Sequence, residues 1–249
     1  MSRPGLFRRL PRLPETWRAP AAIVLIAALA GAGAWLWRAH DRQMEARLLA
    51  APMDKVASDK ALVRYASGKA RPLFARYCAS CHGADMKGKA GTGAPSLTDH
   101  VWLYGGGVYR IDRDILYGLR SGRQRANDLT EMPAFGQRGQ LSEGEIRNVV
   151  QYVLQLAGRP ADATAAQEGA AVYAGHAACY DCHTGDGRGN IDYGATDLTA
   201  NVWDYGGDPK SLYDSIYYGR HGIMPAWIGK LSLTQIRALA VYVNAASQR

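Results

Sequence analysis

The chain has 249 residues, of which 47% are hydrophobic and 21% charged, a composition that excludes a wholly disordered protein and fits one or two folded domains. Its net charge of +8 divides into +5 for residues 1–47, +6 for residues 48–159 and −3 for residues 160–249. The sequence shows no dominant basic face and no motif that reads a nucleic-acid groove, so no nucleic-acid partner is expected.

The first expected element is a membrane-spanning helix. Residues 19–37 carry no charge, and as a helix they would span about 28 Å, close to the ~30 Å hydrocarbon core of a bilayer. Tryptophans flank the run and five arginines precede it, which predicts a cytoplasmic amino terminus and an exported remainder. A cleaved secretory signal is the alternative, because Ala30-Gly31-Ala32 resembles a small-residue cleavage site. We favour an uncleaved, single-pass anchor in a bacterial inner membrane, with periplasmic domains behind it.

The remainder of the chain contains one unit twice. Cys78-Ala79-Ser80-Cys81-His82 recurs 101 residues later as Cys179-Tyr180-Asp181-Cys182-His183. Met132-Pro133-Ala134 recurs as Met224-Pro225-Ala226 at a spacing of 92, so the first unit carries extra residues before Met132. Self-similarity over this length indicates two copies of one domain.

Each unit is predicted to be mainly helical. Its last helix begins with a Ser-x-x-Glu/Gln capping box, at Ser142 in the first unit and at Ser232 in the second. About 90 residues per unit is small for a free-standing hydrophobic core, which suggests that a prosthetic group fills part of the interior. The expected regions are a cytoplasmic terminus and anchor over 1–38, a connector over 39–67, and tandem domains over 68–158 and 159–249.

Cys-x-x-Cys-His is the signature of covalent c-type haem attachment, in which both thiols bond the haem vinyl groups and the histidine binds the iron. A zinc site would need four ligands per ion, a thioredoxin-like pair would need a βαβ setting, and a disulfide within one motif would close a very short loop. Two haem c groups are therefore predicted. The covalent positions are Cys78, Cys81, Cys179 and Cys182, and the proximal ligands are His82 and His183.

The sixth iron position is assigned to Met132 in the first unit and Met224 in the second, because matching methionines precede the last helix of both repeats. A His/Met pair saturates the iron, which predicts an electron relay with no catalytic residue of its own. Met86, only four residues after His82, is expected to be a surface or packing residue. The rival ligands, none of which recurs in the other repeat, are His100, His176 and His221.

Two further groups of residues have alternative interpretations. Four aromatic residues are expected to pack against haem, with propionate binding as a second role: Trp102, Tyr104, Trp203 and Tyr205. Three arginines of the extra segment are expected to lie in a solvated loop, with a docking or propionate-binding role as the alternative: Arg120, Arg123 and Arg125.

Each repeat resembles a class I cytochrome c domain, and the whole chain resembles the dihaem cytochrome c subunit (subunit III) of cbb3-type haem–copper oxidases. The similarity covers about residues 60–249 and rests on Gly93–Thr98, Trp102–Gly106, Met132–Gly136 and Met224–Trp227. It implies a subunit that passes electrons from a soluble cytochrome c to the catalytic subunit of the oxidase during aerobic or microaerobic respiration. The resemblance also implies the haem ligand sets, which are Cys78, Cys81, His82 and Met132 for one haem and Cys179, Cys182, His183 and Met224 for the other.

Two other functions stay open from the sequence. One is a dihaem carrier that serves a periplasmic dehydrogenase without a stable oxidase partner, and the other is a dihaem peroxidase, which would need an iron with an open position. The negative charge of residues 160–249 suggests that the second haem receives electrons from a basic donor. The residues expected to steer that donor are Asp204, Asp208 and Asp214.

Overall fold

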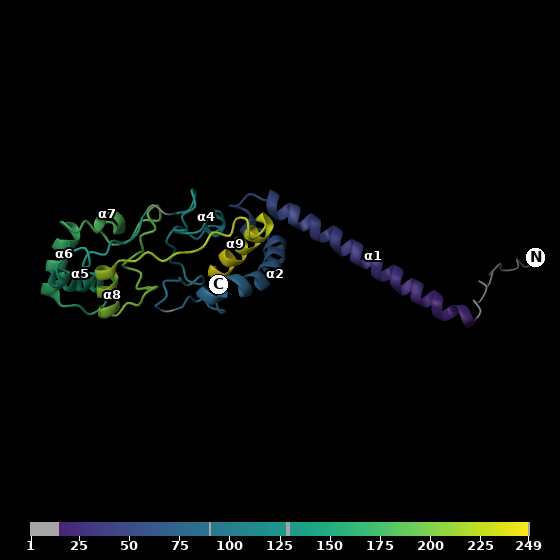
Figure 1. Cartoon of the computed structure of the whole chain (residues 1–249), viewed down its shortest axis with the longest axis horizontal. Helices are drawn as coiled ribbons and strands as arrows, with labels where there is room; N and C mark the ends of the chain where they lie inside the picture. Colours follow the sequence, from purple (N-terminus) through teal and green to yellow (C-terminus); the bar gives the residue numbers. More distant parts are fainter. Residues whose placement is uncertain (1–14, 90, 128–129, 249) are drawn as a thin grey trace, which may run out of the picture. The chain divides into compact units, whose positions relative to one another are not determined.

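The computed structural model describes residues 15–89, 91–127 and 130–248 (Figure 1). Within them the regular elements are α-helices and one short 3₁₀ helix, with isolated β-bridges in place of strands. The predicted mainly helical fold is confirmed. Two units are distinguished along the chain, residues 1–46 and residues 47–249.

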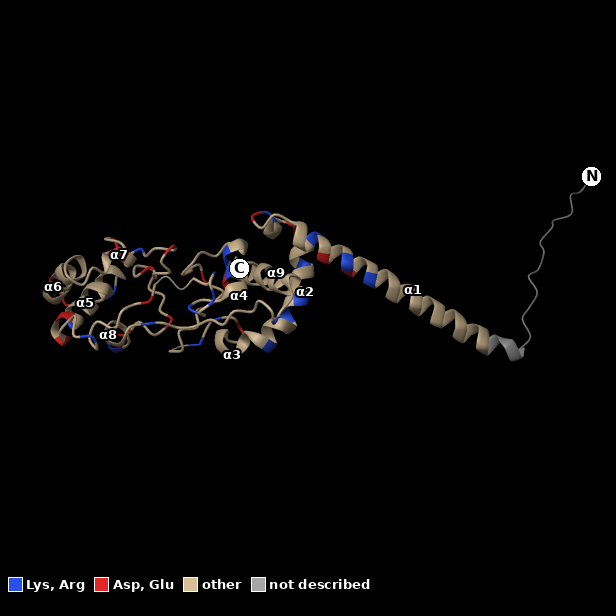
Figure 2. Cartoon of the chain, turned by 45° about the horizontal axis from the view of Figure 1, so that its top comes forward, with Lys and Arg blue, Asp and Glu red and all other residues tan. Residues whose placement is uncertain are grey.

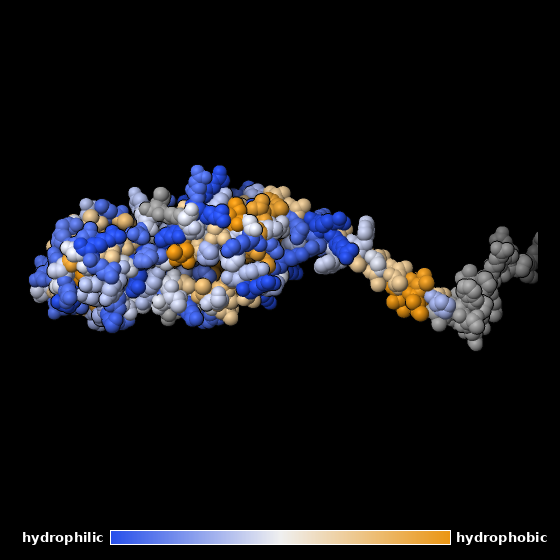
Figure 3. Space-filling view, viewed as in Figure 1, coloured by the Kyte–Doolittle hydropathy of each residue, from blue (hydrophilic) through white to orange (hydrophobic). Residues whose placement is uncertain are grey.

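The first unit consists of one long apolar helix in its described part. Helix α1 (Glu15–Ala50) begins in this unit, and its stretch from Pro20 has a mean hydropathy of 1.8 and the length needed to cross a bilayer. Ile23, Leu29 and Trp35 are each more than 60% exposed, and Figure 3 shows apolar side chains along the helix. The arginines that precede residue 15, on which the predicted orientation depends, lie outside the described residues.

The second unit repeats one order of helices. The 3₁₀ helix η1 (Val56–Ser58) comes first. The first repeat then contributes α2 (Lys60–Tyr77), α3 (Ala79–His82), α4 (Val108–Tyr117) and α5 (Glu143–Leu156). The second repeat contributes α6 (Ala163–Ala174), α7 (Tyr180–His183), α8 (Pro209–Tyr218) and α9 (Leu233–Ser247).

Both predicted capping boxes are present and fix where the last helices begin. The Glu145 N–H donates to Ser142 Oγ, and the Glu145 carboxylate accepts from the Ser142 N–H. Ser232 and Gln235 make the same reciprocal bonds at the start of α9. These bonds satisfy amide groups that an α-helix leaves unpaired in its first turn.

The two repeats exchange their last helices. Helix α9 packs against α2 and α4, whereas α5 packs against α6 and α8, and Figures 1 and 2 show the same two groupings. We call residues 60–118 with 221–248 the first globule and residues 132–220 the second globule. This packing differs from the expectation that each repeat closes on its own last helix. A six-residue loop, 157–162, joins α5 to α6, and so short a connection makes consecutive helices neighbours.

Equivalent contacts hold each exchanged helix in place. In the first globule the ring of Phe74 on α2 meets Tyr242 on α9, with ring centroids 5.9 Å apart. In the second globule the ring of Tyr173 on α6 meets Tyr152 on α5 at 5.1 Å. Gly169 lets α6 approach α5 closely, because a Cβ atom there would overlap the backbone of Asn148.

A buried ion pair also joins α9 to α4. Arg237 Nε donates to Asp112 Oδ1 on α4 at 3.1 Å, and Arg237 Nη1 donates to the carbonyl oxygens of Leu48 and Ala51. Both charged side chains are almost nine-tenths buried. Burial raises the pKa of Asp112 and the guanidinium opposes that rise. Removing one partner would leave an uncompensated buried charge, so the pair makes the position of α9 specific.

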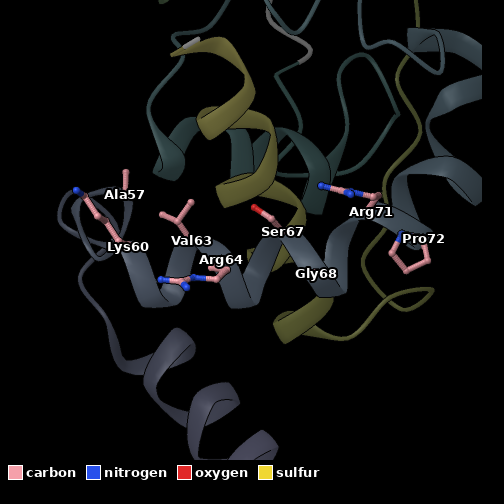
Figure 4. Close-up of a pocket in the computed structure, with 8 residues that line it drawn as sticks. All are labelled: Ala57, Lys60, Val63, Arg64, Ser67, Gly68, Arg71 and Pro72. Carbon is pink, nitrogen blue, oxygen red and sulfur yellow. The ribbon is translucent and has the colours of Figure 1, made fainter.

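The outer face of α2 is basic. A groove of about 540 Å³ runs along it, lined by the side chains of Lys60, Arg64 and Arg71 together with Val63 and Pro72 (Figure 4). Because the opposite face of α2 packs on α9, these cations remain at the surface of the first globule.

The exchange predicts a local effect of weakening α9. Ile236 is fully buried in this helix, so Ile236→Ala should cost about 2–5 kcal/mol of packing free energy. Native-state hydrogen exchange should show faster exchange in α2, whose partner is α9, and unchanged protection in α6.

The matched control is Leu233→Ala, at a position of α9 that is 63% exposed. It should leave both helices protected. Loss of protection in α6 and α8 with α2 unchanged would show that α9 closes its own repeat instead.

Candidate haem sites

Both Cys-x-x-Cys-His motifs form a single helical turn. The His82 N–H donates to the Cys78 carbonyl at 3.0 Å, and the His183 N–H donates to the Cys179 carbonyl at 2.9 Å. This four-residue repeat brings the first cysteine and the histidine of each motif to the same side of the turn. All four cysteines are free thiols.

Each motif histidine is oriented by a backbone carbonyl. His82 Nδ1 lies 3.1 Å from the oxygen of Pro95, and His183 Nδ1 lies 3.0 Å from the oxygen of Thr196. A carbonyl only accepts, so Nδ1 holds the proton and Nε2 keeps its lone pair for a metal. Burial lowers the pKa of both imidazoles, which favours the neutral form that iron binds.

The first thiol of each motif is a weak acid in its buried setting. Burial raises the pKa of Cys78 and of Cys179 to about 11, so both are protonated at neutral pH. Within the described ranges no cluster of three or more His, Cys, Asp or Glu side chains could hold a metal ion. The zinc alternative therefore has no ligand set in that part of the chain.

An apolar cavity of about 400 Å³ lies beside the second motif. Cys179, Cys182 and His183 line it together with Met132. Its remaining wall is mostly aliphatic and aromatic, including Val149, Val153, Leu198, Trp203, Leu212 and Ile216. Two thiols, one imidazole and one thioether around an apolar space are the donor set that a covalently attached haem requires.

The methionine loops are exchanged along with the last helices. Met132 pairs with Arg220 after α8, each N–H donating to the other's carbonyl at 3.1 Å. Met224 pairs in the same way with Leu119 after α4, at 3.0 Å. The ring of Trp227, three residues after Met224, lies 5.2 Å from that of Tyr77, which precedes Cys78.

The structure places the two methionines differently from the pairing that the sequence predicts. Met132 lies with Cys179, Cys182 and His183 in the second globule, and Met224 lies in the first globule with the other motif. The physical cause is that each methionine loop leads directly into the last helix, so an exchanged helix carries its loop with it. Which atoms bind iron stays a prediction.

The rival ligands lie in other settings. His100 and His221 are exposed, and His176 is an exposed side chain 3.0 Å from the Glu145 carboxylate. Met86 is buried, and its carbonyl accepts from the Leu97 N–H, as expected of a packing residue.

The aromatic motifs meet where the globules touch. The ring of Tyr205 lies against Gly93 and the ring of Tyr104 lies against Gly194, and a Cβ atom at either glycine would overlap the facing ring. Trp203 and Tyr205 also line the second cavity, which agrees with the predicted packing role.

The extra segment before Met132 folds back onto α4 and the cavity. Asn127 Nδ2 donates to Asp114 Oδ1 at 2.7 Å, and Arg113 donates to the Arg125 carbonyl at 3.2 Å. Arg123 and Arg125 are exposed, as expected of a solvated loop, whereas Arg120 is half-buried and lines the second cavity.

Two residues of the cavity wall were not identified as such from the sequence. Arg220 belongs to no motif that recurs in the first repeat, and only its place opposite Met132 shows that it lines the cavity. Asp204 was assigned to a docking surface, but it lines the cavity, and burial, with a smaller effect of Asp99, raises its pKa to about 6. The substitution of Asp for the Leu103 of the first repeat was the signal available.

Comparison with known proteins decides the family. Residues 66–153 and 164–243 match the family described as cytochrome c oxidase, cbb3-type, subunit III. The chain belongs to that family. It is 37% identical to the cbb3-type cytochrome c oxidase subunit CcoP of Cereibacter sphaeroides, over 80% of this chain and 67% of that protein. It is 38% identical to CcoP of Rhodobacter capsulatus, over 82% of this chain and 70% of that protein, and 39% identical to FixP of Bradyrhizobium sp. (strain ORS 278), over 80% and 67%.

Membership of the subunit III family confirms several expectations. The two matched regions are tandem cytochrome c-type repeats, and cytochromes of this type carry haem c. The apolar helix α1 fits the single membrane pass of an oxidase subunit. The residue boundaries predicted for the domains stay a prediction.

The exchanged methionines give a direct spectroscopic expectation for a subunit III chain of this geometry. In a variant with Cys78→Ala and Cys81→Ala only the second motif can hold haem. Met132→Ala in that background should abolish the methionine–iron charge-transfer absorption, because Met132 lines the second cavity.

Met224→Ala is the matched control in the same background and should leave that absorption intact. The reverse result, in which Met224 and not Met132 is required, would contradict the exchange.

Proposed function

We propose that the chain is a membrane-anchored dihaem c-type cytochrome that relays electrons from a soluble cytochrome c to the catalytic subunit of a cbb3-type oxidase. The main support for this proposal is that both motif histidines have Nδ1 held by a backbone carbonyl, which leaves Nε2 for iron. The relatives named as oxidase subunits support the partner. Haem bound at these sites supplies a reversible one-electron change at iron.

The proposed ligand sets follow the exchanged geometry. One comprises Cys78, Cys81, His82 and Met224, and the other comprises Cys179, Cys182, His183 and Met132. Thioethers in the sixth position exclude oxygen and peroxide from the iron, so the chain conducts electrons and is no enzyme on its own. The largely aliphatic and aromatic wall of the second cavity would limit the solvent rearrangement that accompanies a change of charge on a bound haem.

The two globules differ in charge more strongly than the two sequence repeats do. The second globule has eleven acidic and six basic residues, whereas the first has eleven basic and four acidic residues. Figure 2 shows Lys and Arg positions in blue along the ribbon of α2 and Asp and Glu positions in red near the start of α5. A basic donor would be steered to the second globule, and the basic face suits an acidic partner surface.

The three aspartates expected to steer the donor make other contacts in the second globule. Asp204 is in the cavity wall, Asp208 caps α8 through the Ser211 N–H, and Asp214 pairs with Lys210 at 2.6 Å. Asp181 within the second motif and Asp186 just after it are both exposed, and Asp186 lies 3.4 Å from the Arg188 guanidinium. These carboxylates lie beside the site that receives the electron in the proposed route.

Mild solubilisation and purification of the membrane complex test the proposed function. Two covalent haems per chain should be present, and haem b and copper should co-purify with them. A carrier that serves a dehydrogenase would instead purify with covalent haem alone. A peroxidase would show a high-spin haem after partial reduction, which the saturated irons proposed here do not.

Reversing one charge tests where the donor docks. Asp186→Lys should slow reduction by a basic soluble cytochrome c several-fold at low ionic strength, and the difference should vanish at high salt.

Asp85→Lys is the matched control, because Asp85 occupies the equivalent exposed position of the first repeat and accepts the equivalent backbone N–H. Equal slowing by both variants, or by Asp85→Lys alone, would contradict an acceptor site on the second globule.

A further inference from the structure

Two guanidinium groups line the wall of the second cavity. Arg120 reaches it from the extra segment of the first repeat, and Arg220 reaches it from the strand-like pair with Met132. Both side chains are half-buried, and among the residues with described positions neither has a carboxylate within ion-pair distance. Cations in such a setting are stable only when an anion or several hydrogen-bond acceptors face them.

The neutral contacts of both arginines orient them without neutralising them. Arg120 Nε donates to the Gly222 carbonyl at 2.6 Å, and its Nη1 lies 3.4 Å from both Tyr104 Oη and the Thr130 carbonyl oxygen. Arg220 Nε donates to Ser215 Oγ at 3.0 Å, and its guanidinium lies over the ring of Tyr205 at 4.2 Å. Each keeps N–H groups available for another acceptor.

The first site lacks the equivalent cation. Leu119 opposes Met224 there through the same reciprocal backbone bonds that Arg220 makes with Met132. The residue of the second repeat that is equivalent to Arg120 is His221, which is exposed. The two repeats therefore share their thiols, histidines and methionines but differ in charge at the position that opposes the methionine.

We propose that Arg120 and Arg220 bind the propionate carboxylates of the haem in the second cavity and raise its midpoint potential. This inference rests on the proposed function, because it requires haem at that site. Guanidinium is the group best suited to a carboxylate, since its planar N–H groups can bind both oxygens. A propionate is the anionic part of a haem, and the cavity that would hold the haem supplies two such groups.

The direction of the effect follows from charge. An unneutralised carboxylate favours the ferric iron, which has one more positive charge than the ferrous iron, and so lowers the midpoint potential. An arginine paired with that carboxylate removes this preference. The second haem thus has a higher midpoint potential than it would have if a leucine, the residue at the equivalent position of the first repeat, replaced Arg220.

The test is an optical redox titration of the purified complex and of its variants. Arg220→Leu gives the second site the residue found in the first, and Arg120→Gln removes the other cation. Each should shift the midpoint potential of one haem downward and leave that of the other haem unchanged. The shifted haem is assigned with the Cys78→Ala, Cys81→Ala background, in which the same shift should appear.

Two further variants separate a charge effect from a general disturbance. Arg220→Lys keeps the cation and should shift the potential less than Arg220→Leu. Arg125→Gln removes an exposed arginine of the same segment and should leave both potentials unchanged.

Covalent haem content, measured on denatured protein, keeps the two proposals apart. A wild-type chain without two haems would refute the proposed function. With two haems present, unchanged potentials in Arg220→Leu and Arg120→Gln would overturn the propionate assignment alone. If Arg220→Leu fails to retain haem, the midpoint potentials of Arg120→Gln and Arg220→Lys still test the propionate assignment. An unchanged potential in Arg120→Gln would then overturn it.

Discussion

The pairing of each methionine loop with the end of a helix from the other repeat is the constraint on which the rest of this structure depends. Two backbone hydrogen bonds join Met132 to Arg220, and two join Met224 to Leu119. Because each loop leads into a last helix, these bonds also determine which core α5 and α9 complete. Each of the two helical cores therefore contains helices from both repeats.

Much of the site was readable from the sequence because its chemistry is local. The Cys-x-x-Cys-His turns, Ser142 and Ser232 capping boxes and the apolar run in α1 each depend on residues close in the chain, and the structure has them where they were expected. The pairing of methionines with motifs was not readable. Helices α5 and α9 have the same apolar period, so the pattern of either is compatible with both cores. Such a periodic pattern shows which face of a helix is buried but not which other helices it packs against.

Charge is another property that only the folded arrangement reveals. Counted by sequence repeat, Asp204 belongs to an acidic surface, but burial places it in a cavity wall. Counted by globule, the acidic and basic residues separate more completely than they do by sequence repeat. Lys60, Arg64 and Arg71 all lie on the α2 surface of the first globule. Arg120 crosses from the sequence of the first repeat to the cavity of the second, which no count along the chain could show. The outcome is two Cys-x-x-Cys-His motifs in globules of opposite net charge.

The interleaving of the repeats is tested most directly by cutting the chain between them. A specific protease site placed in the loop 157–162, where Gly158 is exposed, would divide the holoprotein into two halves. Each half would hold one Cys-x-x-Cys-His motif and one of the two predicted methionine ligands. Size-exclusion chromatography after cleavage should show both halves eluting together at the undivided size, because α5 stays on α6 and α9 stays on α2. Separation into two folded halves, each with its own saturated haem, would contradict the exchange.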